Sequence, residues 1–262
     1  MIPKRYIEEW REFAPWPNDF QVEQDLIIER ALFEIYNDEA LSGQLAFRGG
    51  TAIHKLFLNS PARYSEDIDL VQISPQPIGN TLSRLRKVLS FIQGKITFDN
   101  KNSNTTMNIR YISEFQPFVS MKLKIEINCR EHLNVFGTNS INGKIKSTWF
   151  SSDVNIKTYY SEEILATKLR ALYQRSKGRD LFDLGYTLQE IKPDATKIIY
   201  AFKEYLSYNN ISISSADFVK NLEVKMNDPN FISDINGLIR PGFEFDLSKY
   251  FIDLKENVLR NI

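Results

Sequence analysis

The sequence predicts an α+β protein in which strands and helices, over residues 1–160, precede a mainly helical region, residues 161–262. The first observation is alternation of apolar and polar side chains, clearest over residues 119–127, as in a strand that is buried on one face. The second is helical spacing of apolar side chains over residues 161–174. We therefore expect two domains, with the sheet in 1–160 and a helical domain in 161–262.

The composition is that of a folded chain with a substantial core. Of 262 residues, 42% are hydrophobic and 13% aromatic, which excludes a disordered chain. No apolar run is long enough to cross a membrane, and the start, MIPKRYIEEW, lacks a signal-peptide core. The single cysteine, Cys129, cannot form an internal disulfide, so we expect a cytoplasmic protein with no membrane partner. With His54 and His132 as its histidines, the chain is a poor match for a structural zinc site.

Local patterns predict the elements of the first region in order. Residues 19–40 are amphipathic, so we expect a helix that packs on the sheet. Residues 44–48 suit a first buried strand, and residues 51–58 suit a short helix in which His54 faces outward. Further on we expect a helix over 78–93, strands over 95–100 and 105–113 joined by a polar turn at 101–104, and strands over 119–127 and 155–159.

A glycine turn and a pair of acids lie close together in the sequence. Gly49-Gly50 ends a strand and opens a helix, where bare backbone N–H groups could hold a phosphate. The next strand begins with Asp67-Ile68-Asp69, and both carboxylates share one face because successive side chains of a strand point to opposite faces. Two such carboxylates can bind a divalent cation. The order of the motifs predicts a metal-dependent nucleotide site, although an ordinary turn and a solvated strand are the simpler interpretations of each motif taken singly.

The strand at 119–127 offers a third acid. Its apolar side chains alternate with polar ones, among which Glu126 is the acid. Glu126 is therefore a candidate metal ligand beside the two aspartates. The alternative is an exposed Glu126 that pairs with Lys122 or Lys124.

Lys168 lies within the apolar stripe of the predicted helix 161–174. It is four residues after Ile164 and four before Leu172, on the same helical face. A lysine in this position either extends its amine to the edge of the stripe or is held there for a purpose. We favour contact with the β- and γ-phosphates of a nucleotide.

Positive charge gathers around this lysine. Residues 144–179 contain eight Lys or Arg against three Asp or Glu, whereas residues 1–42 contain four against ten, in a chain of zero formal net charge. The positive segment is a candidate surface for phosphate, with an ordinary solvated face as the alternative. Asp180 and Asp183 lie in the first turn of a predicted helix, 181–191, where they would complement the helix dipole. Later helices are expected over 194–208, 215–226 and 247–260.

These motifs resemble the AbiEii-type nucleotidyltransferase toxins, relatives of the MenT toxins in the polymerase-β-like nucleotidyltransferase superfamily. The resemblance covers residues 19–190 and implies a mixed β-sheet of nucleotidyltransferase fold flanked by helices, followed by a C-terminal helical bundle. It rests on the motifs Phe47-Arg48-Gly49-Gly50-Thr51-Ala52, Arg63-Tyr64-Ser65-Glu66-Asp67-Ile68-Asp69, Lys124-Ile125-Glu126-Ile127, Ala166-Thr167-Lys168-Leu169-Arg170-Ala171-Leu172 and Arg179-Asp180-Leu181-Phe182-Asp183-Leu184.

The resemblance implies roles in catalysis, nucleotide binding and metal binding for the matched residues. Lys168 would neutralise the triphosphate, and Asp180, or in its place Asp183, would orient that lysine or the acceptor. The family matches less well at the third acid, so a site with two protein carboxylates is the alternative to one with three. The ligands of Mg²⁺ or Mn²⁺ would be Asp67, Asp69 and Glu126, and the contacts of the nucleoside triphosphate would be Gly49, Gly50, Thr51 and Ser65.

The implied reaction is metal-dependent nucleotidyl transfer, in which an acceptor hydroxyl attacks the α-phosphorus of a nucleoside triphosphate and pyrophosphate leaves. Two cations would stabilise the attacking and leaving oxygens. In this family the acceptor is often the 3′ end of tRNA, and the proteins are toxins of type IV toxin–antitoxin or abortive-infection systems. We therefore expect tRNA and an AbiEi-like antitoxin as partners. The alternatives are a catalytically silent nucleotide-binding regulatory module, a kinase-like phosphotransferase and a purely structural interaction protein.

Overall fold

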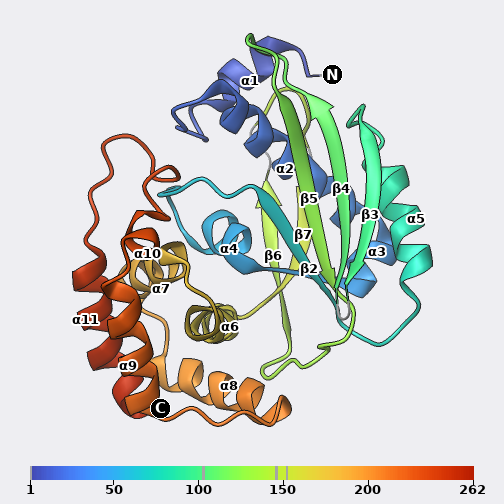
Figure 1. Cartoon of the computed structure of the whole chain (residues 1–262). Helices are drawn as coiled ribbons and strands as arrows, with labels where there is room; N and C mark the ends of the chain where they lie inside the picture. Colours follow the sequence, from blue (N-terminus) through green and yellow to red (C-terminus); the bar gives the residue numbers. More distant parts are fainter. Residues whose placement is uncertain (1, 102–103, 145–146, 152) are drawn as a thin grey trace.

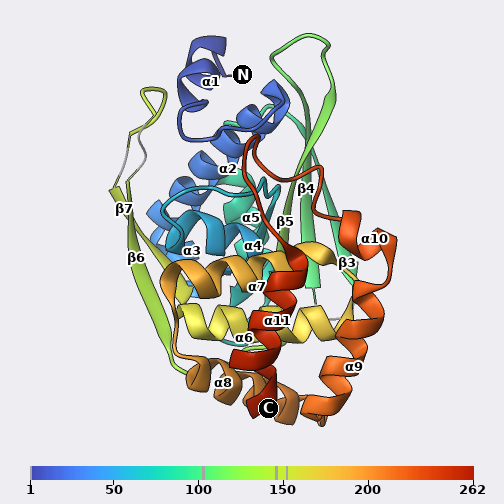
Figure 2. The same cartoon turned by 90° about the vertical axis from the view of Figure 1, so that its left-hand side faces the viewer.

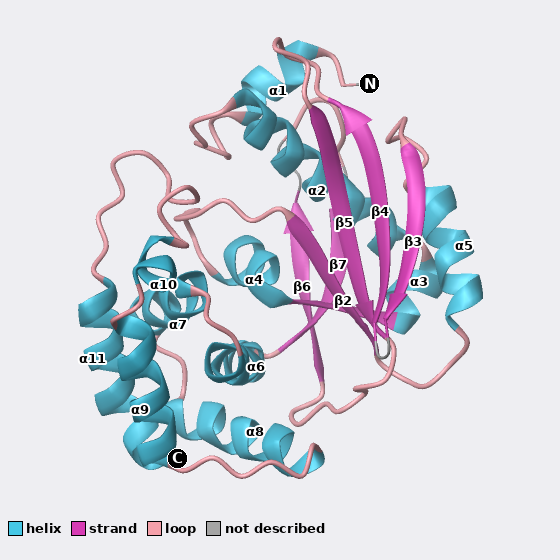
Figure 3. Cartoon of the chain, viewed as in Figure 1, coloured by secondary structure: helices cyan, strands magenta, loops and turns pink. Residues whose placement is uncertain are grey.

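The structure is a computed structural model and describes residues 2–101, 104–144, 147–151 and 153–262. Within these residues the strands form one mixed seven-stranded sheet in the order β3-β4-β5-β2-β1-β7-β6. Helices flank the sheet, and the helices of the C-terminal half gather on one side of it (Figure 1, Figure 3). The α+β class, the mixed sheet and the C-terminal helices are thus confirmed.

The strands lie close to where the sequence patterns predict them. Two neighbouring pairs, β2 with β5 and β1 with β7, are parallel, and the other neighbours are antiparallel. The predicted turn at 101–104 includes residues 102–103, which lie outside the described residues, as do residues 145–146 and 152 of the basic segment. The strands are β1 (Leu45–Arg48), β2 (Asp67–Gln72), β3 (Lys95–Lys101), β4 (Asn104–Ile112), β5 (Ser120–Asn128), β6 (Thr138–Lys144) and β7 (Asp153–Tyr159).

The predicted helices of the first half differ from the structure mainly at their ends, whereas the helices over 4–10 and 39–44 were not predicted. The predicted helix 19–40 ends at Asn37, because the carboxylate of Asp38 accepts hydrogen bonds from the N–H groups of Ala40 and Leu41 (3.1 and 3.0 Å) and caps a separate short helix. The short helix after the glycine turn passes into a π-helical turn. These elements are α1 (Lys4–Trp10), α2 (Asp19–Asn37), α3 (Glu39–Gln44), α4 (Gly49–Ala52), the π-helix Ile53–Phe57 and α5 (Ile78–Val88).

The C-terminal helices pack on one another in layers. Figure 2 shows α6 and α7 crossing in front of the sheet, with α11 packed on α7 and α8 packed on α6. Among the described residues, no helix combines the length and apolar character needed to cross a bilayer. The helices are α6 (Ser161–Gln174), α7 (Gly178–Ile191), α8 (Ala195–Tyr208), α9 (Ser215–Met226), α10 (Pro229–Ser233), α11 (Leu247–Asn257) and the 3₁₀-helix Leu259–Asn261.

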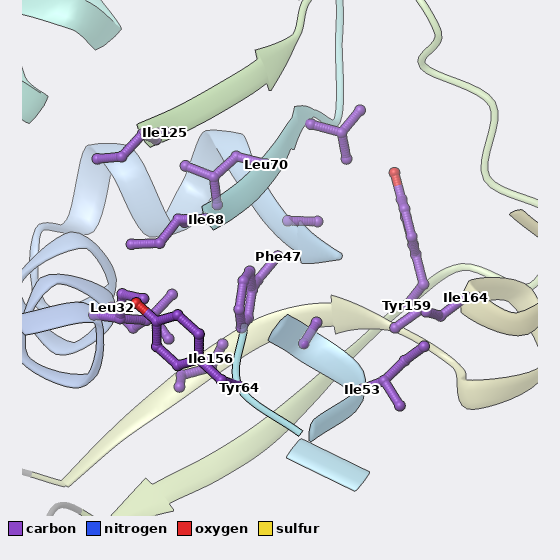
Figure 4. Close-up of a cluster of buried hydrophobic side chains, with 14 of the residues drawn as sticks. Leu32, Phe47, Ile53, Tyr64, Ile68, Leu70, Ile125, Ile156, Tyr159 and Ile164 are labelled. Atoms are coloured by element: carbon purple, nitrogen blue, oxygen red, sulfur yellow. The ribbon is translucent and has the colours of Figure 1, made fainter. Parts of the chain in front are cut away.

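The hydrophobic core lies behind the acids of β2. Ile68 and Leu70 are almost completely buried, together with Ile125 of β5 and Phe47 of β1, and Figure 4 shows part of this cluster. Because the side chains of β2 alternate between its faces, burying the isoleucine and leucine directs both aspartates away from this cluster. The core therefore fixes the orientation of the acidic pair.

The last part of the chain returns to the loop that precedes β2. The N–H of Tyr64 donates to the carbonyl of Leu238 (2.7 Å), and the N–H of Arg240 donates to the carbonyl of Ala62 (3.1 Å). These hydrogen bonds cross the predicted domain boundary at residue 160, which falls between the last strand and α6. The division into two domains stays a prediction.

Candidate active site

Asp67 and Asp69 line a cavity of about 340 Å³ between β2 and α6, a volume within the usual range for small-molecule sites. The parallel pairing of β2 with β5 places Asp67 beside Lys124 and Asp69 beside Glu126. Residues that are level in parallel strands present their side chains to the same face. The three predicted acids are thus brought together on one face, and Lys168 of α6 lines the same cavity.

Asp69 is a half-buried carboxylate with no partner among the residues that the structure describes. Within the described part of the chain it accepts no hydrogen bond and forms no ion pair. Burial, together with the neighbouring charge of Asp67, raises its pKa above the ordinary value for an aspartate. A cation would relieve both effects, so this pair of carboxylates suits a divalent cation.

Glu126 is occupied by other protein groups. Its Oε2 lies 2.8 Å from the Nζ of Lys124, and the side-chain amide of Asn104 donates to its Oε1 (2.7 Å). Burial would raise the pKa of Glu126, but Lys124 outweighs it and lowers the pKa. Among the described residues, no three acids, histidines or cysteines are arranged to hold a metal ion. Glu126 as a third ligand stays a prediction, and the pair with Lys124 matches the alternative.

Each glycine of the turn lies against a charged group of the site. Gly49 has a φ of +82°, and a Cβ there would lie 2.2 Å from Oδ2 of Asp69. At Gly50 a Cβ would lie 2.4 Å from Nη2 of Arg63. The first glycine therefore supplies a left-handed backbone and close contact with the carboxylate, and the second makes room for the guanidinium. Phosphate binding by this turn stays a prediction.

Thr51 and Ser65 are linked behind the acids. The hydroxyl of Thr51 donates to the carbonyl of Asp67 (2.5 Å) and lies 2.8 Å from the hydroxyl of Ser65. Ser65 lines the cavity together with both glycines. Thr51 is 2% exposed, so its contacts suit a residue that positions Ser65, while its predicted contact with the nucleotide stays a prediction.

Lys168 is held in place by two acids rather than reaching the edge of its apolar stripe. Its Nζ lies 3.1 Å from Oδ1 of Asp180 and 2.9 Å from Oδ2 of Asp183. Burial would lower the pKa of this amine, but Asp183 and Asp180 outweigh burial and raise the pKa. Both candidate acids of the predicted site therefore contact the lysine, and Lys168 is a charged group at the cavity wall.

Asp183 is the centre of a buried network that extends into the first half of the chain. Arg63 donates to it twice, at 2.6 and 2.7 Å, and Nε2 of His54 lies 3.0 Å from its Oδ1. Burial would raise the pKa of Asp183, but Arg63 and Lys168 hold it well below the usual value. The expectation that His54 faces outward is wrong, because its side chain is 4% exposed and packs on this carboxylate.

Burial favours the neutral form of His54 in this network. Burial lowers its pKa below the ordinary value for histidine, more than the hydrogen bond with Asp183 raises it. A neutral ring with a hydrogen on Nε2 can donate to that carboxylate. Its Nδ1 has no partner in the described structure. Neither His54 nor Arg63 was predicted as a site residue, since their shared partner is 129 and 120 residues away in the sequence.

Asp180 joins the network to the end of α6. Arg175 donates to both of its oxygens, at 2.7 and 2.8 Å. Burial would raise the pKa of Asp180, but Lys168 and Arg175 lower it. Asp180 thus links two cations that line the cavity, a role beyond complementing a helix dipole.

A second hollow of about 720 Å³ adjoins the first, and Arg48, Arg170 and Arg175 line both. Arg170 makes a bidentate pair with Glu131 at 2.5 and 2.8 Å. Arg130 and the exposed ring of Tyr208 complete a largely polar and cationic wall.

Comparison with known proteins gives a family match and two structural matches. The family model described as nucleotidyl transferase AbiEii toxin, type IV TA system, matches residues 30–255. MenT4, a nucleotidyltransferase toxin from Mycobacterium tuberculosis H37Rv, is 12% identical, with a TM-score of 0.66 over 100% of this chain and 91% of that one. A protein from H. pylori, provisionally described as a nucleotidyltransferase, is 20% identical, with a TM-score of 0.55 over 91% and 92% of the chains. No curated protein matches the sequence. The two structures show the fold.

Proposed function

The chain belongs to the family of AbiEii nucleotidyltransferase toxins of type IV toxin–antitoxin systems, and from this premise we propose that it transfers a nucleotide from a nucleoside triphosphate to an acceptor hydroxyl, with release of pyrophosphate, in the presence of Mg²⁺ or Mn²⁺. The observation that carries the proposal is the Asp69 carboxylate, which has no partner among the described residues and lies beside Asp67 in a cavity that Lys168 also lines. A purely structural protein has no need to keep such a carboxylate half-buried without a partner.

We propose separate roles for the two acids, which bind the cation, and for the glycine turn, which contacts the phosphates. Asp67 and Asp69 would hold the divalent cation, which when bound offsets the negative charge of the triphosphate. Gly49 packs directly against Asp69, so a phosphate at the turn would lie close to that carboxylate. Ser65 adds a hydroxyl on the same wall. We propose these residues as the binding site of the triphosphate.

The cations of α6 supply fixed positive charge. Lys168 is oriented by Asp180 and Asp183, and Arg175 is oriented by Asp180. Charged donors that are already oriented need not reorganise when phosphate arrives, which favours charge neutralisation during transfer. We therefore propose that Lys168 contacts the triphosphate and that Asp180 positions both cations.

The adjoining hollow is our candidate for the acceptor. It meets the nucleotide cavity at Arg48, Arg170 and Arg175, so an acceptor that lies in it could bring its hydroxyl to the first cavity. Arginine side chains suit phosphate, and an exposed aromatic ring such as Tyr208 suits stacking by an unpaired base. These features support an RNA end, and we propose the 3′ end of tRNA as the acceptor and an AbiEi-like protein as the antitoxin.

The test is a labelling assay with purified full-length protein. Incubation with Mg²⁺, total tRNA and each α-³²P-labelled nucleoside triphosphate in turn should label RNA in at least one of the four reactions. Asp67→Ala should reduce labelling at least about 100-fold, because it removes a proposed ligand of the cation that would offset the negative charge of the triphosphate during transfer. Absence of labelled RNA or protein with every nucleotide would contradict nucleotidyl transfer.

The products separate this function from its rivals. Pyrophosphate release indicates nucleotidyl transfer, whereas a nucleoside diphosphate and transfer of γ-label indicate a kinase-like reaction. Nucleotide binding without either product indicates a catalytically silent module. Growth arrest on expression, relieved by co-expression of an AbiEi-like protein, is the corresponding test of the toxin role.

A further inference from the structure

Lys124 places a protein cation among the acids of the candidate metal site. Its Nζ lies 2.8 Å from Oε2 of Glu126 and 3.4 Å from Oδ2 of Asp67. Its side chain is 29% exposed, similar to the 38% of Asp67 and the 30% of Glu126. The ammonium group therefore lies between two carboxylates at the wall of the cavity.

The strand register explains this position. In the parallel pair of β2 and β5, Asp67 is level with Lys124 and Asp69 is level with Glu126. The amine of Lys124 can thus reach across to its strand neighbour and forward to the next side chain on its own face. The same register leaves Asp69 without a partner in the described part of the chain. The four side chains therefore form an uneven set, in which Asp67 and Glu126 are paired with Lys124 and Asp69 is not.

We propose that Lys124 is a built-in cation of this site, which occupies the position between Asp67 and Glu126, keeps Glu126 from acting as a metal ligand and lowers the affinity of Asp67 and Asp69 for a divalent cation. This inference is about metal binding. It rests on the proposed function in one respect, namely that Asp67 and Asp69 are the metal site. The positive charge of Lys124 repels a metal cation bound a few ångströms away, and this repulsion is lost when the lysine is replaced by a neutral residue.

Other nearby lysines do not have this role in the described structure. The amine of Lys168 is engaged by Asp180 and Asp183 and forms no ion pair with the acids of β2 and β5 among the described residues. Lys122 lies on the same face of β5, two residues earlier, and its side chain is exposed. Lys122 therefore shares the strand, the face and the charge of Lys124 without its contacts, which makes it a matched control.

The experiment is a Mn²⁺ titration of the full chain without nucleotide, followed by electron paramagnetic resonance of free Mn²⁺. Lys124→Met should bind Mn²⁺ at least tenfold more tightly than the wild type, or bind a second ion on the released Glu126. Lys124→Arg keeps the charge and should stay within about threefold of the wild type, and so should Lys122→Met. Asp69→Asn should abolish binding, whereas Glu126→Gln in the wild-type background should change it less than threefold. Thermal unfolding of each variant verifies that it is folded.

Three results would overturn the proposal. One is wild-type affinity and stoichiometry in a folded Lys124→Met protein. Another is an effect of Glu126→Gln as large as that of Asp69→Asn, which would make Glu126 a ligand. The third is the absence of Mn²⁺ binding in every variant. If the variants show the expected Mn²⁺ affinities but no RNA or protein is labelled, nucleotidyl transfer is contradicted. The role of Lys124 in metal binding is then still supported.

Discussion

Two groups of charged side chains meet at the cavity, and they are built in opposite ways. The outer group, formed by Asp67, Asp69, Glu126 and Lys124, lies on the strands, and the three of these side chains that form ion pairs are about a third exposed. The inner group lies deeper: its two acids are fully buried and its other side chains nearly so, except Arg175 at its rim, which is 53% exposed. It consists of His54, Arg63, Lys168, Arg175, Asp180 and Asp183.

The difference lies in how completely the charges are paired. In the inner group Asp183 contacts Arg63, Lys168 and His54, as a buried charge must to offset its desolvation. In the outer group Asp69 has no partner in the described structure, although burial raises its pKa. We infer that the inner group maintains the structure and positions cations, and that the outer group is left incomplete for a ligand. Free energies of unfolding can test this division.

The largest expected loss of stability comes from the centre of the inner group. Asp183→Asn should lower the free energy of unfolding by about 3–5 kcal/mol, because it leaves Arg63 and Lys168 buried without their shared counter-charge. Urea unfolding measures the change. Glu223→Gln is the control, since its pair with Lys255 is exposed and should contribute no more than about 0.5 kcal/mol. A change below about 1 kcal/mol in Asp183→Asn would mean that the inner group is not a structural unit.

The acids of the outer group could be predicted from sequence, and so could Lys168 of the inner group with Asp180 and Asp183. The other inner residues, His54, Arg63 and Arg175, could not, and the reason is physical. The period of a strand by itself places Asp67 and Asp69 on one face, and the alternation over residues 119–127 gives β5 and Glu126. The unusual position of Lys168, a charged residue on the apolar face of a helix, is also visible in the local helical pattern. Each of these signals spans fewer than ten residues.

The partners of Asp183 have no local signal. Arg63 is 120 residues away, and its neighbours show neither a strand nor a helix period. His54 was expected to face outward because a polar residue in a short helix usually does, and its burial depends on a carboxylate of α7. Short elements were missed for a similar reason, since α3 and α10 are too short for a periodic pattern and depend on capping acids. Charge pairs between residues that are distant in sequence can therefore be identified only once the fold is known.

A smaller loss of stability is expected at the contact between the glycine turn and the outer group. Gly49→Ala should destabilise the protein by about 1–3 kcal/mol, because its φ of +82° is strained for alanine and its Cβ would lie 2.2 Å from Oδ2 of Asp69. Gly79→Ala in α5 is the control, since no described atom would lie within 4 Å of its added Cβ, and alanine favours a helix. Equal stabilities of the two variants would mean that the turn does not constrain Asp69.

Glu23, a buried carboxylate away from the site, shows how much stability is lost when a carboxylate ionises without enough partners. Glu23 is 1% exposed, and burial raises its pKa to about 7, although the N–H of Glu114 donates to it. A folded-state pKa above the unfolded value means that ionising Glu23 destabilises the protein, with no cost below about pH 4.5 and the full cost above about pH 7. Glu23→Gln should therefore gain about 2–3 kcal/mol over the wild type at pH 8, since one pKa unit corresponds to about 1.4 kcal/mol, and almost nothing at pH 4. A gain that does not depend on pH would contradict this pKa.

The smallest change in stability is expected at the residue that matters most for the proposed reaction. Asp69→Asn keeps the shape of the side chain, breaks no hydrogen bond within the described structure and removes repulsion from Asp67. Its free energy of unfolding at pH 7 should equal that of the wild type or exceed it by up to about 1 kcal/mol. Mn²⁺ should raise the melting temperature of the wild type and not that of the variant, because a cation that binds only the folded state stabilises it. A loss above about 2 kcal/mol would place Asp69 with the structural charges of the inner group, and the division between the two groups would then not hold.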